Sequence, residues 1–308
     1  MNISGSQTQA TGEFTVAIVE FAQARADLHA VREHVFIVEQ GVPAEIERDA
    51  LDPLCRHVIA RNVDGLPIGA GRLTPARRIG RMAVLPDWRG RGVGEAMLQA
   101  LVEEARTLGW HEVSLHAQVS ALTFYSRHGF VPYDPRFVEA GIDHQSMRRR
   151  LGAATPVEGR EAAQAALLGV IAGARRQLLI YSRELDPGLL DQSEVLSALR
   201  RFATGGGEIR ILLQDTATPQ RALAPLLGLG QRLTTAFAFR AIEEPIDRDY
   251  PSAYAANDRG GWYFRALGHR FEGECRMDDP ARVRQLHALF EPVWERARPC
   301  SEFRALGL

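Results

Sequence analysis

Hydrophobic residues in the first half of the chain alternate between strand-like and helical spacing. An apolar run at residues 14–21 predicts a strand, and residues 27–39 then show helical spacing, with Asp27 as the expected N-cap. The next apolar stretches are short and are separated by turn residues such as Asp64-Gly65. They predict three consecutive antiparallel strands, at residues 57–62, 67–73 and 78–84.

The most regular helical pattern begins after a glycine-rich turn. Apolar residues from Ala96 to Leu108 recur at spacings of three and four, and Gly109 follows as a stop. The next predicted elements are a strand at 113–117, a short helix at 121–128 and a strand at 130–133. A meander followed by helix, strand, helix and strand predicts an α/β fold of the α+β type.

A second patterned region follows a break that contains Gly152 and Pro156. The predicted division is a flexible N-terminus at 1–12, a first domain at 13–151, a linker at 152–158 and a second α/β domain at 159–308. In the second domain a helix begins at Ser193, its expected N-cap, and ends at Gly205. The other predicted helices are at 161–175, 223–233 and 280–298, and the strands are at 177–182, 208–214, 236–242, 253–257 and 262–265.

Composition excludes several classes of protein. The 37 basic and 38 acidic residues nearly cancel, which argues against nucleic acid or an anionic membrane as the main partner. The basic clusters at 77–81 and 147–150 leave nucleic-acid binding as a less favoured alternative. No apolar stretch is long enough to span a membrane, and Cys55, Cys275 and Cys300 lack metal-site spacing. We therefore expect a soluble cytoplasmic protein without a metal.

The glycine-rich turn, R-G-R-G-V-G from Arg89 to Gly94, lies between a predicted strand and a helix. Glycines allow main-chain N–H groups to approach an anion closely, and the positive end of the helix dipole lies at the same place. This arrangement predicts a cradle for a pyrophosphate. The alternative is a simple turn from strand to helix.

The motif resembles the coenzyme A signature of the GNAT superfamily, Q/R-x-x-G-x-G/A, which Arg89, Gly92 and Gly94 match. The segment AQVSALTFYSRHGF is similar to the late helix and turn of that superfamily. The blocks VREHVFIVEQGVPAEIERDALD and FVEAGIDHQSM resemble its ElaA-like branch, so that the resemblance covers roughly residues 30–150. It implies a mixed, largely antiparallel sheet flanked by helices, acetyl-CoA as cofactor, and direct acetyl transfer to a primary amine of a small molecule or peptide.

The resemblance also implies roles for individual residues. Tyr125 would protonate the departing thiolate, although an ordinary buried aromatic ring is the alternative. The strand before the cradle would splay from its neighbour and offer a free N–H to the thioester carbonyl. The implied cofactor-binding residues are Met82, Ala83, Val84, Arg89, Gly90, Arg91, Gly92, Val93 and Gly94.

Candidate bases and acceptor-binding residues lie in the same family-like blocks. The candidate bases are Glu39 and Glu47. The candidate acceptor-binding or proton-relay groups are Gln40, Asp49, Asp52, His57, Gln118 and His144. Each has a structural alternative: Glu39 can close a helix, the aspartates can form turns, and the histidines can be structural hydrogen-bonding groups. Cys55 is expected to be an ordinary cysteine.

The second half resembles one half of a phospholipase D-like domain, but its H-x-K-x(4)-D motif is absent. If Asp258 is the aspartate of that motif, Pro251 and Ala253 occupy the histidine and lysine positions, so we expect no phosphodiesterase activity. The domain is therefore predicted to be a binding, regulatory or dimerising module, with a homodimer possible. Because neighbouring residues of a strand face opposite sides, at least one ring of Trp262-Tyr263-Phe264 is expected to be exposed. A non-catalytic acyl-CoA sensor acting through a protein partner is the alternative function.

Overall fold

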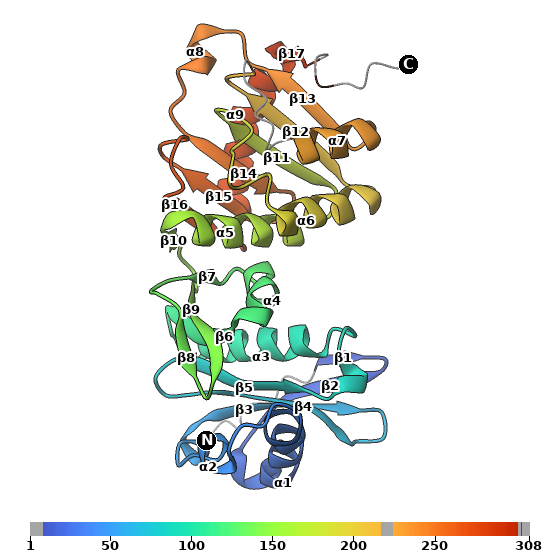
Figure 1. The fold of residues 1–308 in the computed structure, drawn as a ribbon, viewed down its shortest axis with the longest axis vertical. Coiled ribbons are helices and arrows are strands. Elements are labelled where there is room, and N and C mark those ends of the chain that lie inside the picture. The colour runs from blue at the N-terminus through green and yellow to red at the C-terminus, as the bar shows by residue number, and fades with distance from the viewer. Residues whose placement is uncertain (1–8, 217–223, 301–302, 304–308) are drawn as a thin grey trace. The chain divides into compact units, whose positions relative to one another are not determined.

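The computed structural model describes residues 9–216, 224–300 and 303 (Figure 1). By its internal contacts the chain divides into two compact units. The first contains the residues up to 118 together with 136–146, and the second contains 119–135 together with the chain from 147 onward. The second unit therefore includes two segments that precede the predicted linker, residues 119–135 and 147–151.

The first sheet has nine strands in the order β1-β2-β3-β4-β5-β6-β9-β7, with β8 paired to β9. Strands β1 to β5 are antiparallel, whereas β5 and β6 are parallel. The strands are β1 (Gln9–Thr11), β2 (Phe14–Val19), β3 (Arg56–Asn62), β4 (Pro67–Leu73), β5 (Arg78–Val84), β6 (Glu112–Gln118), β7 (Val131–Pro132), β8 (Phe137–Glu139) and β9 (Ile142–Arg150). The predicted three-strand meander is confirmed. The sequence pattern missed β8 and β9.

Helices cover both faces of this sheet (Figure 1). On one face α1 (Phe21–Arg32) packs against β3, β4 and β5 and buries Leu28 and Val31. It continues as a π-helix (Glu33–Glu39), followed by α2 (Ala44–Glu47) and a 3₁₀ turn (Asp52–Leu54). On the other face α3 (Val93–Thr107) buries Met97. A Cβ on residue 69 would lie 2.8 Å from the Met97 sulfur, so glycine at this position in β4 permits the close approach of α3.

One local prediction for the first half was wrong, and another falls largely on residues that the structure does not describe. The N-cap of α1 is Glu20, and Asp27 lies within the helix, where its carboxylate pairs with Arg61 at 2.5 Å. The first turn was missed because the apolar run that predicts the strand extends to Phe21, which is the first residue of α1. The N-terminus predicted to be flexible lies largely outside the described residues, but Gln9–Thr11 forms a strand paired with β2.

The second sheet has eight strands in the order β10-β16-β15-β14-β11-β12-β13-β17. Strands β11, β12 and β13 are parallel, and β14 to β16 continue the sheet with antiparallel pairing. The strands are β10 (Thr155–Val157), β11 (Gln177–Ser182), β12 (Glu208–Leu213), β13 (Phe237–Ala241), β14 (Ala253–Asn257), β15 (Trp262–Arg265), β16 (Gly273–Arg276) and β17 (Arg298–Pro299). The helices of this half are α5 (Gly159–Gly173), α6 (Ser193–Thr204), α7 (Ala224–Arg232), α8 (Pro245–Arg248) and α9 (Pro280–Arg296).

The hairpin predicted around Asp258 is confirmed as β14 and β15. The prediction that this hairpin exposes an aromatic ring is wrong. Trp262 is 5% exposed and Tyr263 is 1% exposed, while Phe264 is half-buried. The reason is that both faces of this sheet are covered, since Tyr263 packs in the core with α5 and Trp262 packs in the core with α9.

Smaller differences concern element ends in the second half. Gln192, not Ser193, is the N-cap of α6, and Ser193 is the first helical residue. The predicted linker contains β10, which pairs with β16. The expected start of α7 at Leu223 lies outside the described residues.

Candidate active site

Strand β5 carries an irregularity directly before the glycine-rich loop. Its register with β4 shifts between Ala70 and Arg72, so that Gly71 of β4 faces both Arg81 and Met82 of β5. Two residues opposite one define a β-bulge, which leaves the extra residue outside the ladder of hydrogen bonds. On its other side, in the described residues, β5 pairs with β6 only as far as Ile79. The end of β5 is therefore free of β6, while Ala83 and Val84 stay paired with Ala70 and Gly69 of β4 after the bulge.

The loop after β5 is open on the side where an anion would approach. Gly90 and Gly92 have φ angles of 75° and 83°, and Gly92 is the N-cap of α3, which has 15 residues. A Cβ built at either glycine would meet nothing within 4 Å. The main chain is thus accessible at the helix end where N–H groups lack intrahelical partners. These residues fit the diphosphate of a coenzyme A thioester, which the N–H groups would bind.

Arg89, the first residue of the motif, is bound to other parts of the protein. Its guanidinium donates to both Glu39 carboxylate oxygens, at 2.8 and 2.5 Å, and to the Val84 carbonyl at 3.0 Å. The hydrogen bond from Arg89 lowers the pKa of Glu39. Arg89 therefore fastens the start of the loop to the π-helix and to the end of β5. The neighbouring Arg91 lies over the Trp88 ring, 5.0 Å from its centroid.

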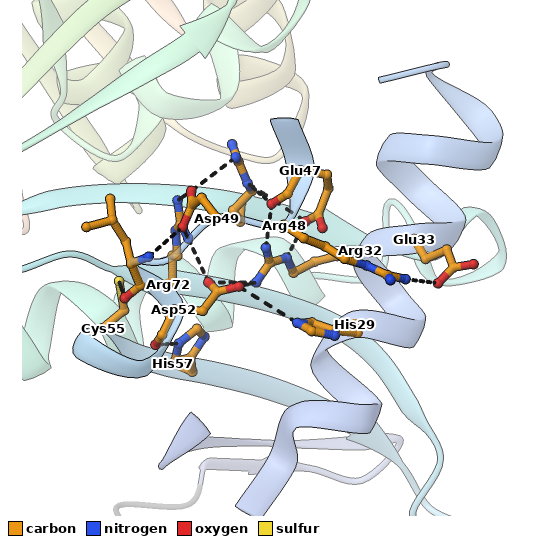
Figure 2. Close-up of polar contacts among 12 residues, drawn as sticks. His29, Arg32, Glu33, Glu47, Arg48, Asp49, Asp52, Cys55, His57 and Arg72 are labelled. Carbon is orange, nitrogen blue, oxygen red and sulfur yellow. Dashed lines mark hydrogen bonds and ion pairs between the residues drawn. The ribbon is translucent and has the colours of Figure 1, made fainter. Parts of the chain in front are cut away.

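A buried ionic cluster lies between α1, α2 and β4 (Figure 2). Arg32, 1% exposed, binds the Glu47 carboxylate through Nε and both Asp52 oxygens through Nη1, at 2.9 and 3.0 Å. Arg72 binds Asp49 with two hydrogen bonds, at 2.8 and 2.6 Å, and Asp52 at 2.6 Å. Hydrogen bonds from Arg72 lower the pKa of Asp49 to about 2. We call these five residues the ionic cluster.

The charges of the ionic cluster depend on one another. Burial by itself would raise the pKa of Asp52, but hydrogen bonds from Arg32 and Arg72 hold it below its usual value. A buried charge without a partner would be strongly destabilising, so each member requires the others. Glu47 and Asp52 are each 2% exposed. Glu47 was predicted as a base, and its burial and its ion pair favour a structural role.

His57 lies beside the ionic cluster and is fully buried. Its Nε2–H donates to the Asp52 carbonyl at 2.8 Å, and burial lowers its pKa, so the ring is neutral. The ring has no exposed surface that could contact an acceptor. Burial also raises the pKa of Cys55, which fits the expectation of an ordinary cysteine. All three cysteines are free thiols and buried.

The other predicted acceptor residues form two groups. Gln118, at the end of β6, donates through Nε2 to the Gln40 side-chain oxygen at 3.0 Å, which joins two residues 78 positions apart. His144 donates through Nδ1 to the Ile142 carbonyl at 2.8 Å and stacks on Phe137. His116 packs edge-on against the same Phe137, and its Nδ1 lies 3.1 Å from the Glu139 carboxylate.

Tyr125 lies on α4 (Leu122–Arg127), which belongs to the second compact unit. The side chain is 8% exposed, and burial raises the pKa of its hydroxyl to about 12. The helix ends in a Schellman motif: Gly129 N–H donates to the Ser126 carbonyl, and Phe130 N–H donates to the carbonyl of Tyr125 itself. The main chain of Tyr125 is therefore part of the helix stop.

Helix α4 is seated on other elements of the same unit. It packs against α5, where a Cβ on residue 169 would lie 2.9 Å from the Ser126 carbonyl oxygen. Met277, after β16, lies against both Gly129 and Gly169. Arg149 of β9 donates to the His128 carbonyl at 2.8 Å. The end of α4 thus contacts α5, Met277 and Arg149.

Sequence reasoning missed the basic half of the ionic cluster. It selected Glu47, Asp49 and Asp52 but not their partners Arg32 and Arg72. It also missed Arg81, which lies outside the cluster and binds Asp49. One signal was present, because three carboxylates within six residues next to apolar strands require cations if they are buried. His116, Phe137 and Glu139 were also missed.

The residues singled out in the second half have structural contacts. The Asp258 carboxylate accepts the N–H groups of Arg175 and Arg176, at 2.8 and 3.1 Å. Arg265, at the end of β15, is 4% exposed and forms a two-point ion pair with Asp186. Its guanidinium is therefore occupied within the domain.

Within the described residues, no group of three or more histidine, cysteine or acidic side chains is arranged to hold a metal ion. No described helix combines the length and the apolar character that crossing a membrane requires.

Comparison with known proteins separates the two halves. The family model of the GNAT acetyltransferase domain matches residues 20–151, and that of a domain of unknown function, DUF7931, matches residues 159–306. The uncharacterised N-acetyltransferase YjcF of Bacillus subtilis is 38% identical over 127 residues, which cover 40% of this chain and 90% of that protein. The uncharacterised protein YyaT of the same organism is 33% identical over 138 residues, which cover 41% and 90%.

Among solved structures, an acyl-CoA N-acyltransferase from Pseudomonas aeruginosa is 30% identical with a TM-score of 0.40, covering 44% of this chain and 98% of that one. Escherichia coli ElaA is 27% identical with a TM-score of 0.39 and the same coverage. This chain belongs to the GNAT acetyltransferase family through residues 20–151, and it is an acyltransferase.

Proposed function

We propose that this protein moves an acetyl group from acetyl-CoA directly to a primary amine of a small molecule or a peptide, within a complex that holds both substrates. The observation that carries the proposal is the open main chain at Gly90 and Gly92, at the N-terminal end of α3. Free N–H groups and the helix dipole both favour a negative charge at this place. The diphosphate of acetyl-CoA supplies that charge.

The main-chain N–H groups of Met82, Ala83 and Val84 are proposed to donate hydrogen bonds to the carbonyl oxygen of the thioester. When the amine nitrogen attacks the carbonyl carbon, negative charge develops on the carbonyl oxygen, and a fixed N–H donor stabilises it. The bulge and the short pairing with β6 support this role, because the bulge interrupts the ladder with β4 at Arg81 and Met82 and this end of β5 does not pair with β6.

Tyr125 is proposed to protonate the sulfur as the carbon–sulfur bond breaks. An acid must hold its proton at neutral pH, and the raised pKa of the buried hydroxyl, about 12, keeps Tyr125 protonated. The products are then the acetylated amine and the free thiol of coenzyme A.

The amine must lose a proton before it attacks, and Glu39 and Glu47 are the candidate bases. We propose that Glu47 holds the ionic cluster instead, since it is buried against Arg32. Glu39 lies at the surface, but its pairing with Arg89 lowers its pKa and weakens it as a base. Gln40, Gln118 and His144 remain the proposed acceptor contacts, whereas Asp49 and His57 are engaged in or beside the cluster.

We propose that the second domain is non-catalytic and acts by seating α4. Gly169 and Met277 contact the end of the helix that carries Tyr125, so this domain can set the position of the proposed acid. Its likeness to a phospholipase D-like half-domain stays a proposal, supported by three parallel strands that continue into an antiparallel hairpin. A homodimer also stays a proposal.

The test is an assay of free coenzyme A release from acetyl-CoA with a panel of small amines and peptides, with the acetylated product identified by mass spectrometry. The proposal expects one class of amine to be acetylated. Tight acetyl-CoA binding by calorimetry without turnover on any amine would instead favour the alternative function, an acyl-CoA sensor that acts through a protein partner.

A further inference from the structure

Arg81 has a backbone conformation that is unusual within a strand. Its φ angle is 52°, in the left-handed region, and it forms the bulge of β5 together with Met82. In one type of bulge the first residue takes this conformation and is normally glycine, because a side chain makes it unfavourable. An arginine at this position therefore requires something that holds it there.

The hydrogen bonds of the Arg81 side chain stabilise this left-handed conformation. Its Nη2 donates to the Ile46 carbonyl at 2.7 Å and reaches an Asp49 oxygen at 3.4 Å, and its Nε donates to the Glu47 carbonyl at 3.2 Å. Ile46 and Glu47 are the last residues of α2, where carbonyl groups lack intrahelical partners and a cation is favoured.

The groups that bind Arg81 are themselves fixed by the ionic cluster (Figure 2). Arg32 binds both the carboxylate and the carbonyl of Glu47, and Arg72 binds both oxygens of Asp49. Because Asp52 accepts from both Arg32 and Arg72, the contacts form one continuous network. Arg81 is the member of this network that lies on the bulge.

We propose that Arg81 is a positioning residue for acetyl transfer: its contacts with the end of α2 and with Asp49 hold the left-handed conformation that creates the bulge, and the bulge orients the N–H groups of Met82 to Val84 toward the thioester oxygen. This inference rests on the proposed function. In this proposal the ionic cluster shapes β5 and does not bind the amine.

The position allows a test that separates backbone geometry from charge. Glycine adopts a positive φ freely and needs no side-chain contacts to stay there. Alanine has neither the contacts nor that freedom. If Arg81 acts through its backbone, glycine should preserve the bulge and alanine should lose it. If only the charge matters, the two substitutions should be equally harmful.

The experiment compares Arg81→Ala with Arg81→Gly in the full chain, on an amine that the wild-type protein acetylates. We expect kcat to fall about 100-fold for Arg81→Ala and to stay within about 5-fold of wild type for Arg81→Gly. KM for acetyl-CoA should change less than about 3-fold in both, because the cradle is untouched. Crystal structures of the two variants should show the bulge kept with glycine and lost with alanine.

Arg77 offers a matched control. It is an exposed arginine with φ of 61° in the turn before β5, outside the bulge. Arg77→Ala and Arg77→Gly should both leave kcat within about 2-fold of wild type. Circular dichroism and thermal unfolding would identify a variant that fails to fold.

Three outcomes would overturn the inference: equal kcat for Arg81→Gly and Arg81→Ala, a retained bulge in Arg81→Ala, or an equal loss in Arg77→Ala. A wild-type protein that binds acetyl-CoA but acetylates no amine refutes the proposed function, and the role of Arg81 in transfer falls with it. The crystal structures still decide separately whether Arg81 creates the bulge.

Discussion

The protonation of Tyr125 can be followed through the pH dependence of turnover. Its pKa is raised by burial from an ordinary value of 10.0 to about 12. An acid must be protonated to act, so kcat should decline only as pH approaches about 12. At pH 10.5 an ordinary tyrosine would retain about a quarter of its protonated form, whereas Tyr125 should retain nearly all of it. We therefore expect a flat kcat between pH 8 and roughly 10.5.

The substitution Tyr125→Phe removes only the hydroxyl. It should lower kcat by about 100-fold and leave acetyl-CoA affinity, measured by calorimetry, nearly unchanged. Tyr181→Phe is the matched control, because Tyr181 is also a buried tyrosine with a pKa raised to about 12 but lies on β11. A decline of wild-type kcat near pH 10 that disappears in Tyr125→Phe would refute the effect of burial. A loss of less than about 3-fold would refute the role as acid.

Three other predictions address the cradle, the ionic cluster and the seat of α4. Gly92→Glu should abolish acetyl-CoA binding in calorimetry by placing a carboxylate where the diphosphate binds, whereas Gly109→Glu, at the other end of α3 with a similar positive φ, should not. Asp49→Asn should lower the free energy of unfolding by about 2 kcal/mol at pH 7. Because folding lowers the Asp49 pKa from 3.8 to about 2, this difference in free energy should shrink as pH falls from 4 toward 2. Amide hydrogen exchange of β3–β5 would measure the difference, and a value that stays constant over this pH range would contradict the prediction. Gly169→Ala should lower kcat by about 10-fold by displacing α4. It should lower kcat no further when Tyr125 is already replaced by Phe. Gly228→Ala, at a glycine in another helix, is the control and should leave kcat unchanged.

Much of the fold could be predicted because its signals are local. The strands at β3, β4, β5 and β11 and the hairpin β14–β15 have the expected bounds to within a residue, since apolar runs bounded by turn residues report on the backbone directly. The short strands β8, β10 and β16 were missed, because three or four residues give too little periodicity. The exposed ring expected from Trp262-Tyr263-Phe264 was wrong because a sequence does not show that a sheet is covered on both faces.

The sequence by itself determined the glycine loop between β5 and α3, because the positive φ of Gly90 and Gly92 and the helix end that follows are properties of neighbouring residues. Only the tertiary structure decided that Arg32 and Arg72 bind the same Asp52, 20 residues from each, and that Arg81 forms a bulge. The physical reason is that a buried charge requires a partner of opposite sign, but the chain's path in space selects which residue that partner is. In the same way, the helix that carries Tyr125 can be predicted from its own residues, whereas its contacts with Gly169 and Met277 cannot.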